Sequence, residues 1–177
     1  MSKLTLIVGP MRAGKTSRLL AMHARGLSDG YRCLLVGSAL DTHSPAGAVR
    51  SHPGASSKAE VVDRLATLRV AGYDQVYVNE CQFFQDPETI ASWLDQNPGL
   101  LVVACGLDSD YKRAPFGPWL GRLIPHATDI VKLLGICSTC GEATALFTHK
   151  IRGRPDRLDV TADYKALCRG CYIRENL

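Results

Sequence analysis

The chain has 177 residues, of which 46% are hydrophobic and 21% are charged, and its formal net charge at pH 7 is +4. This composition is ordinary for one globular domain with a small appendage, and it excludes a disordered or fibrous chain. The mild positive charge suits phosphate-bearing substrates, but no Lys/Arg block of the kind found in nucleic-acid-binding tails interrupts the sequence.

Five short apolar runs are expected to form the strands of one sheet, and they occupy residues 4–8, 33–36, 76–78, 101–104 and 130–134. Each run is rich in Val, Ile and Leu, and continuous apolarity without alternation is typical of parallel strands buried on both faces. Helical patterns lie between the runs at residues 16–26, 57–71 and 87–94. The alternation predicts an α/β fold, an open parallel sheet with helices on its faces.

Several boundary residues support these elements. Gly26 and Gly72 follow the first two helical patterns, and Asp86 is the expected N-cap of the third, with Pro87 in its first turn. Residues 41–57 are rich in His, Ser, Pro, Gly and Ala and are expected to form a flexible loop. Closely spaced cysteines begin near residue 136, so we divide the chain into an α/β domain at 1–135 and a small C-terminal domain at 136–177.

The first apolar run is followed by a complete G-x-x-x-x-G-K-[ST] motif: Gly9, Pro10, Met11, Arg12, Ala13, Gly14, Lys15 and Thr16. The motif lies between a predicted strand and a predicted helix, as a phosphate-binding loop requires. The fold class is therefore expected to be an α/β parallel sheet of the P-loop NTPase type, flanked by helices. Its backbone N–H groups and the helix N-terminus would surround the phosphates of ATP. Lys15 would reach the β- and γ-phosphates, and the Thr16 hydroxyl would be a ligand of Mg²⁺.

A phosphate loop identifies the nucleotide but not the reaction, so an acid at a neighbouring strand end is informative. The run at 76–78 is followed by Asn79 and Glu80. In P-loop proteins an acid at this place supports Mg²⁺ or activates the nucleophile. Glu80 could accept the proton of a substrate hydroxyl, or it could be an exposed carboxylate at a strand end.

The last part of the chain contains two C-x-x-C pairs, Cys137 with Cys140 and Cys168 with Cys171. Four thiolates satisfy tetrahedral Zn²⁺ and leave no open position for chemistry, so the pairs predict a structural zinc site. Cys33, Cys81 and Cys105 have no such partners and are interpreted as packed thiols.

The first three residues lead directly into an apolar strand, so we expect no secretory signal peptide. No run of about 18 apolar residues is present, so no membrane span and a cytoplasmic protein are expected. Cysteines in that compartment are expected to be free or bound to metal.

Together these segments resemble the tetrameric, zinc-containing thymidine kinases of the cellular and bacterial type. The likeness covers nearly the whole chain and is carried, in the order typical of that family, by residues 9–16, 79–84, 106–117 and 168–172. It implies that Glu80 is the general base for the 5′-hydroxyl of deoxythymidine. It also implies a nucleoside pocket formed by Met11, Phe83, Leu107, Tyr111 and Tyr164, the last in a lasso loop that closes over the base. A homotetramer, inhibition by dTTP, and no nucleic-acid or membrane partner are further expectations by analogy.

Three positions depart from the pattern of that family. Asn79 stands where an Asp usually assists the metal, so Mg²⁺ binding is expected to lean on Thr16 and water. His43 replaces an arginine expected near the phosphates, for which Arg12 or Arg50 could substitute. Residues 158–164 lack a glycine pair, which bears on the fit of the base.

Other interpretations remain open at this point. The substrate could be another pyrimidine deoxynucleoside, such as deoxyuridine or a modified base. The chain could instead be a P-loop ATPase whose zinc ribbon binds nucleic acid, or a kinase-shaped protein that has lost catalysis through Asn79. Lys112, Arg113 and Arg122 could approach phosphates and subunit contacts, as the resemblance implies, or form a solvated basic face.

Overall fold

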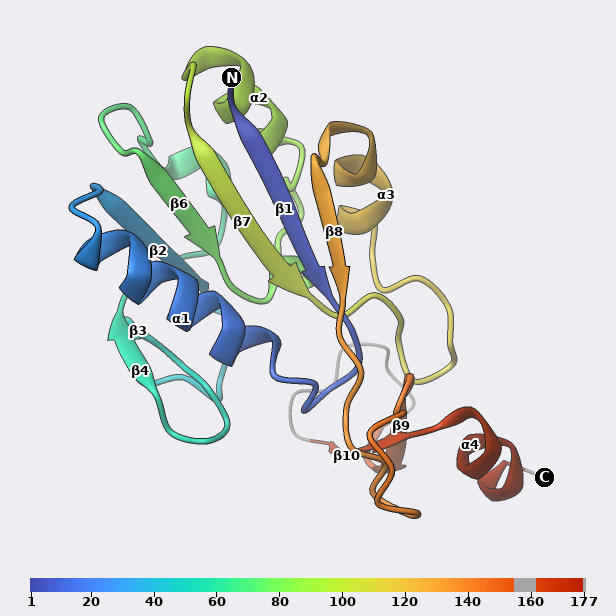
Figure 1. Ribbon diagram of the computed structural model, residues 1–177. Coiled ribbons are helices and arrows are strands. Elements are labelled where there is room, and N and C mark those ends of the chain that lie inside the picture. The colour runs from blue at the N-terminus through green and yellow to red at the C-terminus, as the bar shows by residue number, and fades with distance from the viewer. Residues whose placement is uncertain (155–161, 177) are drawn as a thin grey trace.

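A six-stranded parallel sheet forms the centre of the computed structural model, which describes residues 1–154 and 162–176. The strand order is β5-β2-β6-β7-β1-β8, and every pairing in this sheet is parallel (Figure 1). The bounds are β1 Lys3–Val8, β2 Cys33–Ser38, β5 Glu60–Val62, β6 Gln75–Val78, β7 Leu101–Gly106 and β8 Asp129–Lys132. The five predicted strands are confirmed, although the last begins and ends earlier than expected, and β5 is an addition.

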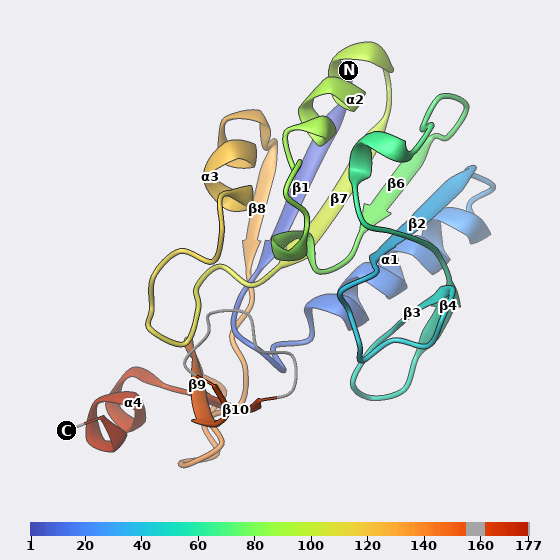
Figure 2. The ribbon, with the colours of Figure 1, turned by 180° about the vertical axis from the view of Figure 1, so that it is seen from behind.

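Helices cover both faces of the sheet (Figure 1 and Figure 2). Helix α1, Lys15–Ser28, packs its Leu19 and Leu20 on one face against Ile7, Tyr77 and Val103. Helices α2, Thr89–Gln96, and α3, Trp119–Leu123, cover the other face, where Trp93, Trp119 and Leu123 are buried. Burial on both sides explains the continuous apolarity of β1, β2, β6 and β7. The edge strand β8 differs from the expected buried strand, because Ile130 is 51% exposed.

The helix predicted over residues 57–71 is wrong. The structure has β4 Ser56–Lys58, β5 and a short 3-10 helix η1, Leu65–Thr67, in its place. Strand β5 pairs with the edge of β2, with Val61 opposite Gly37. Backbone pairing with an open sheet edge outweighs a helical periodicity whose apolar residues occur nearly as often in strands.

Residues 41–57 are also more ordered than the expected loop, because β3, Ala48–Arg50, pairs antiparallel with β4. Val49 of β3 is fully buried and packs in the same core as Leu35 of β2. One apolar side chain therefore anchors this ribbon beside the sheet.

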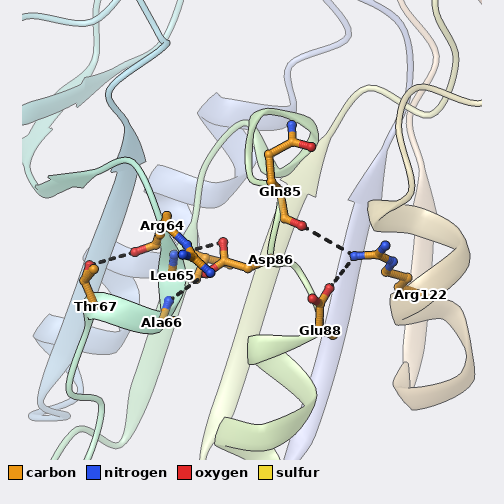
Figure 3. A network of polar contacts seen from close by, with 8 residues as sticks. All are labelled: Arg64, Leu65, Ala66, Thr67, Gln85, Asp86, Glu88 and Arg122. Atoms are coloured by element: carbon orange, nitrogen blue, oxygen red, sulfur yellow. Dashed lines mark hydrogen bonds and ion pairs between the residues drawn. The ribbon is translucent and has the colours of Figure 1, made fainter.

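Asp86 does not cap α2, which begins at Thr89 and is preceded by Glu88. The two carboxylate oxygens of Asp86 instead accept hydrogen bonds from the backbone N–H groups of Leu65 and Ala66 at 3.2 and 2.9 Å (Figure 3). An aspartate that would suit a helix N-cap thus supplies the same kind of bond to η1, a segment some 20 residues earlier in the chain.

The C-terminal segment lies beyond the carboxyl ends of β1 and β8 (Figure 1). It contains β9 Phe147–Arg152 and β10 Asp163–Leu167, which pair antiparallel, and α4 Arg169–Glu175. Its buried residues form their own cluster: Cys137, Ala145, Ala166, Leu167, Cys171 and Tyr172. Among the described residues, no helix has the length and apolar character needed to cross a membrane.

Candidate active site

A cleft of about 1020 Å³ lies at the carboxyl ends of the parallel strands, because residues directly after β6 and β7 line it. Ligands of open α/β sheets bind at this edge. Eleven of the residues predicted to bind substrates line it: Met11, Arg12, Gly14, Lys15, Thr16, Asn79, Glu80, Phe83, Leu107, Tyr111 and Tyr164. The fold therefore brings the phosphate loop, the end of β6 and the expected nucleoside pocket together in one cavity.

Gly9, Pro10 and Ala13, also predicted to bind ATP, do not line the cleft. Gly9 instead packs tightly against the end of β8, where a Cβ would lie 2.4 Å from the carbonyl oxygen of Leu133. The first glycine of the motif is therefore required for close packing of the loop on the sheet.

The phosphate loop is folded around Lys15, whose side chain is only 6% exposed. Its ammonium group donates to the carbonyl oxygen of Pro10 at 2.7 Å. Burial lowers the pKa of Lys15, and the negative charge of Glu80 acts in the opposite direction. Gly14, at φ 83°, precedes the first turn of α1, so the N–H groups of that turn face the same cavity.

Asn79 lies at the end of β6 with 1% exposure, and its Oδ1 accepts two hydrogen bonds. The Thr16 hydroxyl donates to it at 3.0 Å and the Cys105 thiol at 3.2 Å. Burial raises the pKa of Cys105 to about 12, so this thiol keeps its proton and remains a donor. Because an amide oxygen has two lone pairs, this one is fully used within the protein.

Glu80 has a left-handed backbone, with φ 52° and ψ 51°, immediately before the 3-10 helix η2, Cys81–Phe83. This conformation costs a non-glycine residue roughly 1–2 kcal/mol, and such strain is common at functional sites. The Glu80 carboxylate accepts a hydrogen bond from the Gln82 side-chain amide. Glu80 therefore faces the cleft from a defined position.

The residues of the expected nucleoside pocket come from several segments: Met11 from the phosphate loop, Phe83 from η2, Leu107 and Tyr111 from the segment after β7, and Tyr164 from β10. The Leu107 carbonyl accepts from the Trp119 indole N–H at 3.0 Å. The rings of Tyr111 and Tyr164 lie 4.4 and 5.5 Å from the Lys150 ammonium group, measured to the ring centroids. Two aromatic rings of the predicted pocket thus lie close to one cation. Residues 158–161 of the predicted lasso loop lie outside the described residues.

The charged residues divide into two groups. Arg12, His43 and Arg50 line the cleft, so both arginines expected to substitute for the missing one lie on the same cavity as Lys15. Of the other cations, Arg113 stacks 4.9 Å from the Tyr172 ring, and Arg122 forms an ion pair with Glu88 at 2.6 Å between α2 and α3 (Figure 3). Neither of these two lines the cleft.

The four cysteines of the C-x-x-C pairs converge, with all their sulfur atoms within 4.8 Å of one another. Cys140 and Cys168 are 3.9 Å apart, and the Arg174 guanidinium donates to the sulfur of Cys171 at 3.0 Å. Zinc bonds of about 2.3 Å in a tetrahedron place the sulfurs roughly 3.8 Å apart, so the residues present fit this metal.

Hydrogen bonds between described residues connect the cysteine-containing segment to the cleft. The Met11 N–H in the phosphate loop donates to the Thr148 hydroxyl at 3.0 Å, and the Tyr172 hydroxyl donates to the Tyr111 carbonyl at 3.0 Å. The segment is therefore attached both to the phosphate loop and to the expected nucleoside pocket.

Sequence reasoning assigned no role to Thr148 or Gln82. Thr148 is one threonine in a short strand, and nothing local marks it as a partner of a loop more than 130 residues away. Gln82 belongs to a recognised motif, but its partner Leu107 becomes visible only in three dimensions.

Comparison with known proteins identifies relatives over nearly the whole chain. The family model for thymidine kinase matches residues 2–172. A thymidine kinase of Bacteroides thetaiotaomicron is 32% identical, with 97% of this chain and 87% of the relative aligned. Thymidine kinases of Pseudothermotoga lettingae and Pyrobaculum aerophilum are 32% and 33% identical, with 96% of this chain and 94% and 98% of the relatives aligned.

Proposed function

The chain belongs to the thymidine kinase family, and we propose that it transfers the γ-phosphoryl group of ATP to the 5′-hydroxyl of deoxythymidine, giving dTMP. The observation that carries this proposal is the cleft itself. It places a phosphate loop, the carboxylate of Glu80 and a partly aromatic pocket around one cavity. A phosphate donor and a nucleoside hydroxyl can meet there.

The phosphate loop supplies the donor site. The N–H groups at the start of α1 face the cavity and would bind the phosphates, with Lys15 moving from the Pro10 carbonyl onto the β- and γ-phosphates. Burial makes a neutralising phosphate partner favourable for the Lys15 ammonium group. Arg12 and Arg50 would add positive charge on the outer side of the γ-phosphate.

The Thr16 hydroxyl would be the protein ligand of Mg²⁺. When bound with ATP, this ion neutralises charge on the phosphates as they react. Because the Asn79 oxygen already accepts from Thr16 and Cys105, we assign Asn79 the task of orienting Thr16, and not that of a direct metal ligand. The donated proton directs the lone pairs of Thr16 towards the cavity.

Glu80 would act as the general base. As the O5′–P bond forms and the bond from phosphorus to the β,γ-bridging oxygen breaks, the hydroxyl proton passes to the Glu80 carboxylate and ADP leaves. Most of the acceleration comes from positioning and electrostatics, and the base contributes about 10²–10⁴-fold. The defined backbone and side-chain position of Glu80 suits this task.

The nucleoside would lie against Met11, Phe83, Leu107, Tyr111 and Tyr164, with an aromatic ring stacked on the thymine base. We propose that residues 136–177 form a separate zinc-binding lasso domain, in which Cys137, Cys140, Cys168 and Cys171 hold a structural Zn²⁺. Zinc there would hold the two segments that carry the cysteine pairs in one constant geometry. A cytoplasmic homotetramer inhibited by dTTP completes the proposal, on the analogy of the family.

A purified-protein assay with Mg²⁺-ATP and each natural nucleoside tests the proposal through formation of 5′-monophosphate. Selective phosphorylation of deoxythymidine is expected, and selectivity for another pyrimidine would replace the substrate while keeping the reaction. The family match and the nucleoside pocket do not favour a nucleic-acid-binding ATPase, which would hydrolyse ATP without phosphorylating any nucleoside.

The role of Glu80 is tested by Glu80→Gln, which keeps the size of the side chain and removes the base. Turnover should fall about 10²–10⁴-fold, while ATP affinity stays close to that of the unmodified protein. Glu88→Gln makes the same change outside the cleft and is the matched control. Near-normal turnover of Glu80→Gln would rule out Glu80 as the base.

A further inference from the structure

We propose that Gln82 is a positioning residue that aims the carboxylate of Glu80 and ties it to the nucleoside pocket. This inference rests on the proposed function, because it concerns the same reaction. Gln82 lies in η2, two residues after Glu80, and only 4% of it is exposed.

The orientation of the Gln82 amide follows from its two neighbours. The Leu107 backbone N–H can only donate, and it donates to Oε1 of Gln82 at 3.0 Å. The amide oxygen therefore faces Leu107, and the amide NH₂ faces Glu80. Since a carboxylate can only accept, that NH₂ is the complementary group for Glu80, and the two form a charge-assisted hydrogen bond.

The space for this bridge is built into the end of β7. A Cβ on Gly106 would lie 2.5 Å from Oε1 of Gln82 and 2.9 Å from the Trp119 ring. The Trp119 indole in turn donates to the carbonyl of Leu107. Gly106 and Trp119 thus leave the Gln82 amide one position, with Leu107 held beside it.

The bridge joins two groups that must be aligned for reaction. Glu80 would take the proton of the 5′-hydroxyl, and Leu107 would contact the base of the same nucleoside. A glutamate side chain has several rotamers, and a Glu80 carboxylate that points away from the 5′-hydroxyl does not help the reaction. Gln82 therefore links the nucleoside pocket to the orientation of the Glu80 carboxylate.

This role predicts that Gln82 affects turnover and not donor binding. Gln82→Glu keeps an acceptor for the Leu107 N–H and replaces the donor to Glu80 by a second carboxylate. Gln82→Met has similar length and removes both hydrogen bonds. We expect kcat to fall about 10- to 100-fold in both variants, the range that outer partners of reacting groups typically control, with the KM for ATP within about twofold of the unmodified protein.

The decisive experiment combines each variant with Glu80→Gln in a double-mutant cycle, with deoxythymidine and ATP as substrates. If Gln82 acts through Glu80, the double variants should turn over within about threefold of Glu80→Gln alone, because the group that Gln82 positions is already absent. Two results would overturn the inference. One is that a Gln82 substitution lowers kcat in the Glu80→Gln background as much as it does in the unmodified protein. The other is that either folded single variant keeps a kcat within twofold of the unmodified protein.

Two controls separate this inference from other failures. Turnover by the unmodified protein in the same assay tests the proposed function independently of Gln82. Thermal unfolding and ATP binding of each variant test folding, and Gln82→Glu carries the experiment if loss of the Leu107 bond prevents Gln82→Met from folding.

Discussion

Replacing Gly106 by alanine should destabilise the protein far more than a single methyl group usually does. Gly106 has no left-handed backbone, so alanine is compatible with its conformation in β7. The penalty comes from three neighbours, because the new Cβ would lie 2.5 Å from Oε1 of Gln82, 2.9 Å from the Trp119 ring and 3.3 Å from the Cys81 nitrogen. Overpacking of this kind costs about 1–3 kcal/mol.

A second contribution comes from hydrogen bonding. The Gln82 oxygen must move by several tenths of an ångström, which breaks or bends its bond to the Leu107 N–H and leaves a buried donor without a good partner. That loss is worth about 1 kcal/mol. The free energy of unfolding should therefore fall by roughly 2–4 kcal/mol, which lowers the Tm by about 5–15 °C in a chain of this size.

The measurement is urea-induced unfolding of Gly106→Ala beside Gly121→Ala. Gly121 lies inside α3, where a Cβ would meet nothing within 4 Å, so alanine there should stabilise the protein by about 0.5–1 kcal/mol. If the free energy of unfolding of Gly106→Ala is within about 0.5 kcal/mol of that of the unmodified protein, the tight packing around Gln82 does not exist.

Three further predictions concern metal, pH and the phosphate site. Cys140→Ser should lose bound zinc and lower the Tm, whereas Cys33→Ser should keep the metal. Elemental analysis and calorimetry test this. A Cys140→Ser protein that is loaded with zinc and equally stable would contradict the four-cysteine site. Burial lowers the pKa of His23 below its ordinary 6.5, so the unfolded chain binds this proton more readily, and stability should decline by up to about 1.4 kcal/mol per pH unit as the pH falls below 6.5. Denaturant unfolding from pH 8 to 5 should show this slope reduced in His23→Gln, and equal slopes would refute it. Asn79→Asp adds a negative charge beside Thr16 and should lower the Mg²⁺ concentration for half-maximal activity about fivefold. This is the effect of roughly 1 kcal/mol, the energy of two charges that interact through water at 4 Å. An unchanged Mg²⁺ titration would show that residue 79 does not influence the ion.

The features predicted correctly from the sequence are those whose signal is local. The phosphate loop and the two C-x-x-C pairs depend on a few consecutive residues, and buried parallel strands are recognisable by continuous apolar runs. The errors arise where tertiary contacts decide. Residues 57–71 have apolar residues compatible with a helix, but the open edge of β2 recruits 60–62 as a strand.

The cleft shows the same division. Glu80 and Lys15 stand in motifs, and those motifs alone are enough to assign them candidate roles. Asp86 accepts hydrogen bonds from η1, Gln82 accepts one from Leu107, and Thr148 accepts one from Met11. The two partners of each pair are separated by 20 or more residues in the sequence. A single sequence contains no signal for such pairs, because a polar side chain is compatible with many partners until the fold selects one.

The position of β1 in the sheet has a consequence for how the chain is made. β1 comes first in the sequence but lies between β7 and β8, with Lys3 opposite Leu101 and Thr5 opposite Asp129. At a synthesis rate of about 5–20 residues per second, β1 waits roughly 5–20 s for its first partner to be translated. During that time an apolar strand has no partner, and the turn that follows it has no sheet on which to pack. A nascent chain that ends before β7 would therefore expose β1 to association with other chains.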